Sequence, residues 1–114
     1  PHRTSKLYYL AATPALQTAY QSAFGDLVLE IDGTERRATA WPDWAVTTRV
    51  DTAAYWPQVW QAVQCHRSQL ANYRALADLP PVSHQALWGE QTFYRAFSLV
   101  NGGRAVETDL FTGF

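Results

Sequence analysis

The stretch KLYYLAA at residues 6–12, followed directly by Thr13-Pro14, decides the class of fold that the sequence predicts. Its apolar and aromatic side chains are typical of a buried β-strand. Thr13 is a good N-cap residue and proline suits the first turn of a helix, so a helix is predicted to begin at Pro14 and run through Tyr20. Gly25 is a natural C-terminal signal for that helix. Together with the strands and helices predicted further along the chain, this stretch indicates an α/β or α+β fold, and we predict α/β.

A β-hairpin is predicted next along the chain. Residues 26–31 (DLVLEI) and 34–41 flank Asp32-Gly33, a pair that favours a two-residue type I′ turn because both central residues need positive φ. Pro42 should end the hairpin, and residues 45–50 (AVTTRV) alternate like a further strand.

The longest predicted helix starts at Trp56-Pro57, where Trp56 can serve as the N-cap residue. Its apolar stripe comprises Trp56, Val59, Trp60, Val63 and Leu70, with Tyr73 at the edge. His66 lies on this stripe, so we expect its side chain to be mostly buried and Cys65 to face the other way. Two interpretations of His66 stand side by side: a pocket residue that orients a ligand, or a hydrogen-bonded histidine of the core.

The C-terminal third predicts one more helix and a turn. Ser83 can cap a helical stretch that carries Leu87, Trp88, Phe93, Tyr94 and Phe97, with an interruption at Gly89. A turn follows at residues 101–103 (NGG), and residues 106–111 form a short terminal segment.

Length, composition and charge exclude several classes of protein. The 114 residues suffice for one domain, 47% are hydrophobic and 17% are charged, which is globular composition. The net charge of -1 gives no field that attracts nucleic acid or an anionic membrane surface, and no apolar run is long enough to span a bilayer. A single cysteine, Cys65, fits a reducing compartment.

Short motifs alone do not predict a reaction. The three histidines, His2, His66 and His84, lack the spacing of a zinc site, and Cys65 has no second cysteine as partner. No nucleophile elbow of the Gly-x-Ser-x-Gly type and no phosphate-binding loop occurs. We therefore predict no catalytic residue and no metal ligand within this chain.

Four segments follow one another along the chain: residues 1–9 (PHRTSKLYY), the stretch from Val50-Asp51 to the HRSQ of residues 66–69, residues 88–95 (WGEQTFYR), and residues 107–114 (ETDLFTGF). Their order resembles the second half of the PIG-L/LmbE family of zinc-dependent N-deacetylases. The resemblance covers nearly the whole chain.

The resemblance implies a Rossmann-like fold, of which this chain would be the C-terminal portion: the last part of the sheet, an added β-hairpin and two or three helices. It implies a hydrolase in which zinc-activated water removes an N-acetyl group, usually from an amino sugar. The zinc ligands of the family lie in His-Pro-Asp-Asp and His-Pro-Asp-His motifs, neither of which occurs here. Zinc is thus expected in the complete protein and not in this chain alone.

Three residues are candidates for the substrate pocket because they match the family pattern: Arg3, His66 and Gln69. The expected partners are the N-terminal half of the same protein, a second copy in a homo-oligomer, and a small N-acetylated substrate, in the cytoplasm. The alternative is a non-enzymatic assembly or ligand-binding module that uses its many aromatic residues at an interface.

Overall fold

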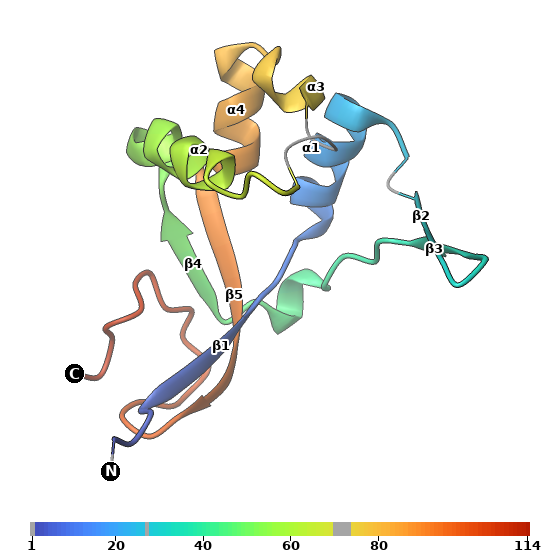
Figure 1. The fold of residues 1–114 in the computed structure, drawn as a ribbon. Helices are drawn as coiled ribbons and strands as arrows, with labels where there is room; N and C mark the ends of the chain where they lie inside the picture. The colour runs from blue at the N-terminus through green and yellow to red at the C-terminus, as the bar shows by residue number, and fades with distance from the viewer. Residues whose placement is uncertain (1, 27, 70–73) are drawn as a thin grey trace.

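The computed structural model of the chain describes residues 2–26, 28–69 and 74–114. A three-stranded antiparallel sheet has the order β1-β5-β4, and β2 and β3 form a separate hairpin. The helices gather at one end of the larger sheet, and both chain ends lie towards the other end (Figure 1). The elements are β1 (Lys6–Leu10), α1 (Pro14–Phe24), β2 (Val28–Ile31), β3 (Thr34–Arg37), η1 (Asp43–Ala45), β4 (Thr48–Asp51), η2 (Ala53–Tyr55), α2 (Trp56–Gln64), α3 (Arg74–Ala77), α4 (Pro81–Trp88) and β5 (Glu90–Ser98).

The prediction of a mixed α/β fold is confirmed. The strand pairs in the described parts of both sheets are antiparallel. A Rossmann-like arrangement therefore stays a prediction about the complete domain.

Helix α1 begins and ends where the sequence predicts. The hydroxyl of Thr13 accepts a hydrogen bond from the backbone N–H of Leu16 at 3.1 Å, and Pro14 occupies the first turn. At the other end Gly25 has φ of 77°, a conformation that suits glycine, and its N–H donates to the carbonyl of Gln21.

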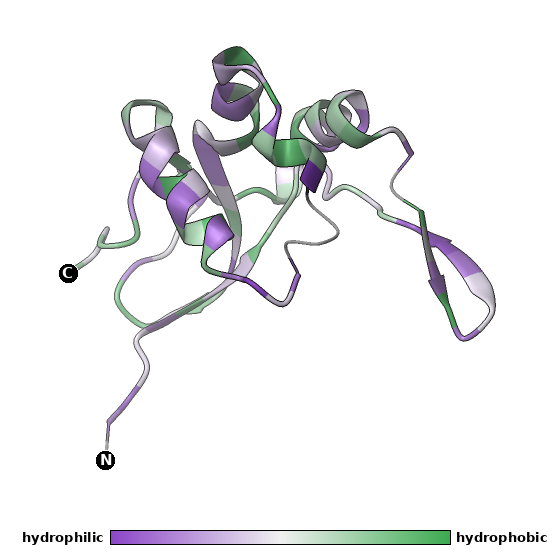
Figure 2. Ribbon diagram, turned by 45° about the horizontal axis from the view of Figure 1, so that its top comes forward, coloured by the Kyte–Doolittle hydropathy of each residue, from purple (hydrophilic) through white to green (hydrophobic). Residues whose placement is uncertain are grey.

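The hairpin turn is also confirmed. Asp32 and Gly33 have φ of 52° and 73°, as a type I′ turn requires, and Ile31 pairs with Thr34. The strands are shorter than predicted, since β3 ends at Arg37. The hairpin extends away from the helices and the larger sheet (Figures 1 and 2).

The predicted C-terminal ends of two helices are wrong. Helix α2 stops at Gln64, so it does not reach His66; Leu70 and Tyr73 lie outside the described residues. The predicted final helix is α4 alone, and Phe93, Tyr94 and Phe97 belong to β5. Here Gly89 ends the helix, and the following run of threonine and aromatic residues is better suited to a strand than to a helix.

Strand β1 was predicted to be buried, and this is wrong for several of its side chains. Leu7, Tyr9 and Leu10 are 40%, 51% and 71% exposed. The reason is the position of the strand: β1 pairs with β5 on one side only and stands at the edge of the sheet. The opposite edge strand, β4, is partly covered by a parallel bridge between Thr48 and Glu107.

The core lies between the helices and is aromatic. Leu76, Leu87 and Trp88 are buried, and the α2 stripe of Trp56, Val59, Trp60 and Val63 packs against them, as predicted. His84 is 5% exposed in this core. Its ring stacks on Trp56 at a centroid distance of 5.4 Å, and its Nδ1 accepts a hydrogen bond from Nε1–H of Trp88 at 3.1 Å.

The molecule is more open than a self-contained domain of its size. The radius of gyration is 16.0 Å, whereas a compact chain of this length has about 13 Å. The accessible surface is 8295 Å², whereas a folded monomer of this mass exposes about 6,300 Å². The chain thus leaves about 2,000 Å² of additional surface open to solvent or to a partner.

Candidate functional site

The three predicted pocket residues are not brought together by the described chain. Arg3 is exposed and precedes β1, at the end of the sheet far from the helices (Figure 1). His66 and Gln69 are exposed in the turns that follow α2. The prediction that His66 is buried on the inner face of the helix is wrong because α2 ends two residues earlier. Cys65 is exposed as well. A shared pocket stays a prediction for the complete protein.

A different group of side chains forms the most highly connected polar site in the described residues. We call it the Glu107 cluster, and it consists of Lys6, Tyr8, Arg95, Asn101 and Glu107. The side chain of Glu107 is only 2% exposed. Its Oε2 accepts hydrogen bonds from the Tyr8 hydroxyl at 2.6 Å and from Lys6 Nζ at 3.3 Å. Its Oε1 accepts from Arg95 Nη1 and, at 3.2 Å, from Asn101 Nδ2.

Backbone geometry places Glu107 at this point. Its N–H donates to the carbonyl of Thr47 and its carbonyl accepts from the N–H of Arg49, both at 2.9 Å, so the segment lies along the edge of β4. Tyr8 and Arg95 are register partners on β1 and β5. The carboxylate therefore joins the N-terminal strand, the central strand and the C-terminal segment.

The hydrogen bonds determine the charge state of the cluster. Burial raises the pKa of Glu107, but hydrogen bonds from Tyr8, Arg95, Asn101 and Lys6 outweigh that effect and lower the pKa to about 2. Burial and the bond to Glu107 raise the pKa of Tyr8. Glu107 is thus ionised and fully hydrogen-bonded at neutral pH, which suits a structural role and leaves no free base.

We expect the free energy of unfolding to decrease as the pH falls from about 5 towards 2. The pKa of Glu107 in the folded chain, about 2, is below the ordinary value of 4.5, so the unfolded state binds more protons in this window and acid favours unfolding. Urea denaturation of the protein at several pH values measures this. Glu107→Gln should flatten the dependence, whereas Glu35→Gln, on an exposed side chain, should not; equal slopes in both variants would contradict the assignment.

The segments that carry the family resemblance already contain most of this cluster, although the sequence analysis assigns these residues no role. Lys6, Tyr8, Arg95 and Glu107 all lie in the segments that carry the family resemblance, yet none was assigned a role. Their proximity depends on pairing between residues about a hundred positions apart, which the sequence alone does not display.

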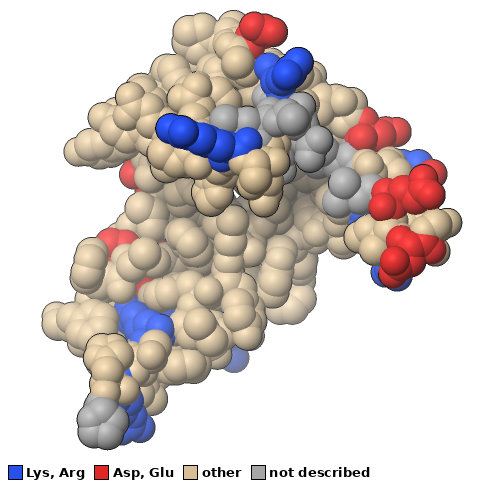
Figure 3. All heavy atoms as spheres, viewed as in Figure 1, with Lys and Arg blue, Asp and Glu red and all other residues tan. Residues whose placement is uncertain are grey.

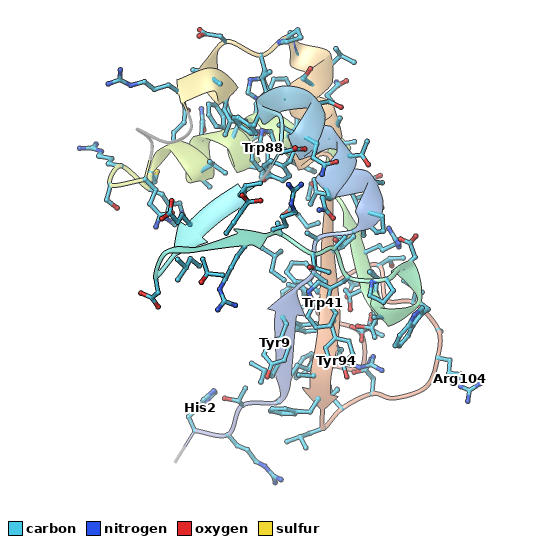
Figure 4. The ribbon with its side chains drawn as sticks, turned by 90° about the vertical axis from the view of Figure 1, so that its right-hand side faces the viewer. His2, Tyr9, Trp41, Trp88, Tyr94 and Arg104 are labelled. Atoms are coloured by element: carbon cyan, nitrogen blue, oxygen red, sulfur yellow. The ribbon has the colours of Figure 1, made fainter. Side chains whose placement is uncertain are left out.

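A second arrangement lies on the sheet. Tyr9 and Tyr94 stack across β1 and β5 at 6.3 Å between ring centroids, and Trp41 stacks on Tyr94 at 5.3 Å. Figure 4 shows these three rings beside the two strands, well away from Trp88 in the helical core. With Tyr9 half exposed, the row forms an aromatic surface at the open edge of the sheet.

The described residues do not fit a zinc centre. Across residues 2–26, 28–69 and 74–114 there is no group of three or more His, Cys, Asp or Glu side chains that could hold a metal ion. The ring of His84 packs against Trp56 and Trp60, and Glu90 accepts a hydrogen bond from Arg49 at 2.8 Å. We derive no chemistry through a metal on this chain.

None of the helices in the described part of the chain is sufficiently long and apolar to cross a bilayer.

No family model, no curated protein and no solved structure matches this chain.

Proposed function

We propose that this chain is the C-terminal part of a zinc-dependent hydrolase that removes N-acetyl groups from amino-sugar-type substrates, similar to the PIG-L/LmbE deacetylases. The complete domain would be Rossmann-like and cytoplasmic. The metal and its ligands would belong to the preceding half, because the described residues of this chain do not fit a zinc site. Arg3, His66 and Gln69 would meet the substrate only when that half is present.

The observation that carries this proposal is the Glu107 cluster. The resemblance rests on four segments, of which the second, from Val50 to Gln69, contributes no side chain to this cluster. Lys6 and Tyr8 come from the first of these segments, Arg95 from the third and Glu107 from the last. Their contacts with one buried carboxylate support the interpretation that these segments belong to one structural pattern.

The open surface supports the partial nature of the domain. The additional exposed area of about 2,000 Å² falls in the range of an obligate interface. Three exposed apolar side chains, Leu7, Tyr9 and Leu10, lie on β1, an edge strand that holds neither proline nor, apart from Lys6, a charged residue. Such an edge is a template for a further strand. A strand from the preceding half would extend the sheet there and cover Tyr9 and Leu10.

The row of stacked rings formed by Trp41, Tyr94 and the half-exposed Tyr9 favours a second candidate, a non-enzymatic assembly or ligand-binding module. Aromatic side chains with one polar end are enriched in interfaces. In this alternative the chain would be stable alone, and the row itself would be the functional surface.

An association experiment separates the two candidates. The isolated 114 residues are expected to self-associate or to unfold without a cooperative transition, because the edge and face of β1 are uncovered. Co-expression with the upstream part of the coding sequence should give one complex with a cooperative transition. Size-exclusion chromatography and urea denaturation measure both. A monodisperse, cooperatively folding 114-residue monomer would favour the module and count against the deacetylase.

A further inference from the structure

Lys6 is the only lysine among the 114 residues, and its amino group is covered although it stands on an edge strand. The side chain of Lys6 is 5% exposed. Two of its contacts, with Glu107 and the Tyr8 hydroxyl, belong to the Glu107 cluster. Two more come from the segment that follows: the carbonyl of Leu110 lies 3.4 Å from Nζ, and the ring centroid of Phe114 lies 5.6 Å from it. The second distance is that of a cation–π contact.

We call residues 108–114 the strap, and its shape is held by hydrogen bonds of its own. The carboxylate of Asp109 accepts from the N–H of Phe111 at 2.7 Å and from the hydroxyl of Thr112 at 3.3 Å. The N–H of Phe114 donates to the carbonyl of Phe111 at 3.0 Å and closes a turn. Asp109 is the only charged residue of the strap, whereas the acidic side chains visible in Figure 3 gather mainly on the projecting hairpin.

Gly113 fastens the strap to the turn that follows β5. Its φ of 96° favours glycine and suits the third position of a type II turn. A Cβ atom here would lie 2.7 Å from the Cβ of Asn101 and 2.8 Å from the carbonyl oxygen of Val100. Asn101 is itself held, because its side chain bonds to Ser98 at 2.6 Å and to Glu107 at 3.2 Å. The strap can therefore approach this closely only with glycine at residue 113.

We infer that the strap controls access to Lys6, and that closure of the strap and acylation of Lys6 oppose each other. In the reaction with an activated acyl ester, the neutral amine attacks the carbonyl carbon and a C–N bond forms. The ester C–O bond breaks, its electron pair leaves with the alcohol part, and one amine proton passes to water. The closed strap blocks the approach of the ester, and the ion pair with Glu107 keeps the amine protonated.

Acylation in turn removes the positive charge of Lys6. The ion pair with Glu107 and the contact with the ring of Phe114 both depend on that charge. The strap should therefore open more often once Lys6 is acylated, as linkage requires. This inference rests on contacts within the chain and does not depend on the proposed function.

The test measures how fast the N-hydroxysuccinimide ester of acetic acid acetylates Lys6 in the folded protein, by mass spectrometry of proteolytic peptides. Lys6 is expected to react more than about tenfold more slowly than a free lysine side-chain amine in the same solution. Gly113→Ala should raise the rate by about tenfold, since alanine is strained at this φ and its Cβ meets Asn101. Gly103→Ala is the matched control: φ is 95° but the space is open, so the rate should stay within about twofold.

Phe114→Ala provides a second measurement where circular dichroism shows that Gly113→Ala is unfolded. The side chain of Phe114 is 75% exposed, so its removal leaves the core intact, yet it should speed acetylation because it uncovers Nζ. Protein acetylated at Lys6 with excess reagent should be cleaved after Phe111 faster than unmodified protein. The inference is overturned if Lys6 of the unaltered protein reacts as fast as the free amine, if neither variant changes the rate, or if Gly103→Ala raises it as much as Gly113→Ala. Equal cleavage of acetylated and unmodified protein overturns the linkage.

Discussion

Expressed alone, the 114-residue chain is expected to retain no stoichiometric zinc and to release no acetate from N-acetylglucosamine derivatives. A catalytic zinc site needs about three protein ligands and an open position. The described residues provide no group of three candidate ligands. Water away from a metal is a very weak acid, whereas a catalytic zinc lowers the pKa of its bound water to about 7, so the isolated chain lacks the zinc-bound hydroxide nucleophile at neutral pH. Activity should fall to the background of the buffer.

Metal analysis and an acetate-release assay measure this result, and the complex with the proposed preceding half is the positive control, in which both zinc and activity should appear. In that complex Arg3→Ala or His66→Ala should lower turnover more than zinc content, because neither residue is proposed as a ligand. Thr4→Ala, at an exposed neighbour of Arg3, is a matched control and should change neither. Tight, stoichiometric zinc in the isolated chain would place the metal site here after all, and loss of zinc from His66→Ala would make His66 a ligand.

The sequence predicted correctly those helix ends and turns that are determined by interactions between residues close together in the chain. The Thr13 cap, Gly25 and the Asp32-Gly33 turn each act within a few residues, and each has the predicted geometry. The stripe of α2 is a short-range pattern too, and its tryptophans pack in the core as expected.

The errors arise where neighbours distant in sequence decide the outcome. Residues 90–98 contain apolar side chains at spacings that fit a helix or a strand, and pairing with both β1 and β4 makes them a strand. The spacing of apolar residues in α2 predicts that the helix continues to His66, but the helix ends at Gln64. No glycine or proline at that point signals the end of the helix in the sequence.

The candidate site was the least predictable part. The family pattern selected Arg3, His66 and Gln69, which the structure leaves exposed; Arg3 precedes β1, whereas His66 and Gln69 lie together in the turns that follow α2. The buried cluster depends on Glu107, a residue in an eight-residue C-terminal segment with no regular secondary structure of its own. A carboxylate in such a segment is usually solvated. Glu107 is buried because Lys6 and Tyr8 from β1 and Arg95 from β5 donate hydrogen bonds to it.

Glu107→Gln is expected to destabilise the full-length protein by about 3 kcal/mol, at the lower end of the effect of removing one partner from a buried ion pair. The amide keeps the volume of the side chain but removes the charge, and it leaves the guanidinium of Arg95, whose side chain is 12% exposed, without its counter-ion. Urea denaturation followed by tryptophan fluorescence measures the change. The matched control is Glu35→Gln: this carboxylate pairs with Arg37 at 3.3 Å, but both side chains are more than 60% exposed, so the cost should stay below about 1 kcal/mol.

The same variant should also loosen the C-terminal segment, because Glu107 is its deepest attachment to the sheet. Beyond Glu107, residues 108–114 are exposed and touch the sheet through few polar contacts, among them the bond from Lys6 Nζ to the carbonyl of Leu110. Limited proteolysis under native conditions should therefore cleave after Phe111 faster in Glu107→Gln than in Glu35→Gln, before the rest of the protein is digested. If both variants lose stability equally, or if the segment resists cleavage in Glu107→Gln, then the carboxylate does not hold the two ends of the chain together. In that case the convergence of the sequence segments on Glu107 would no longer support the proposed family.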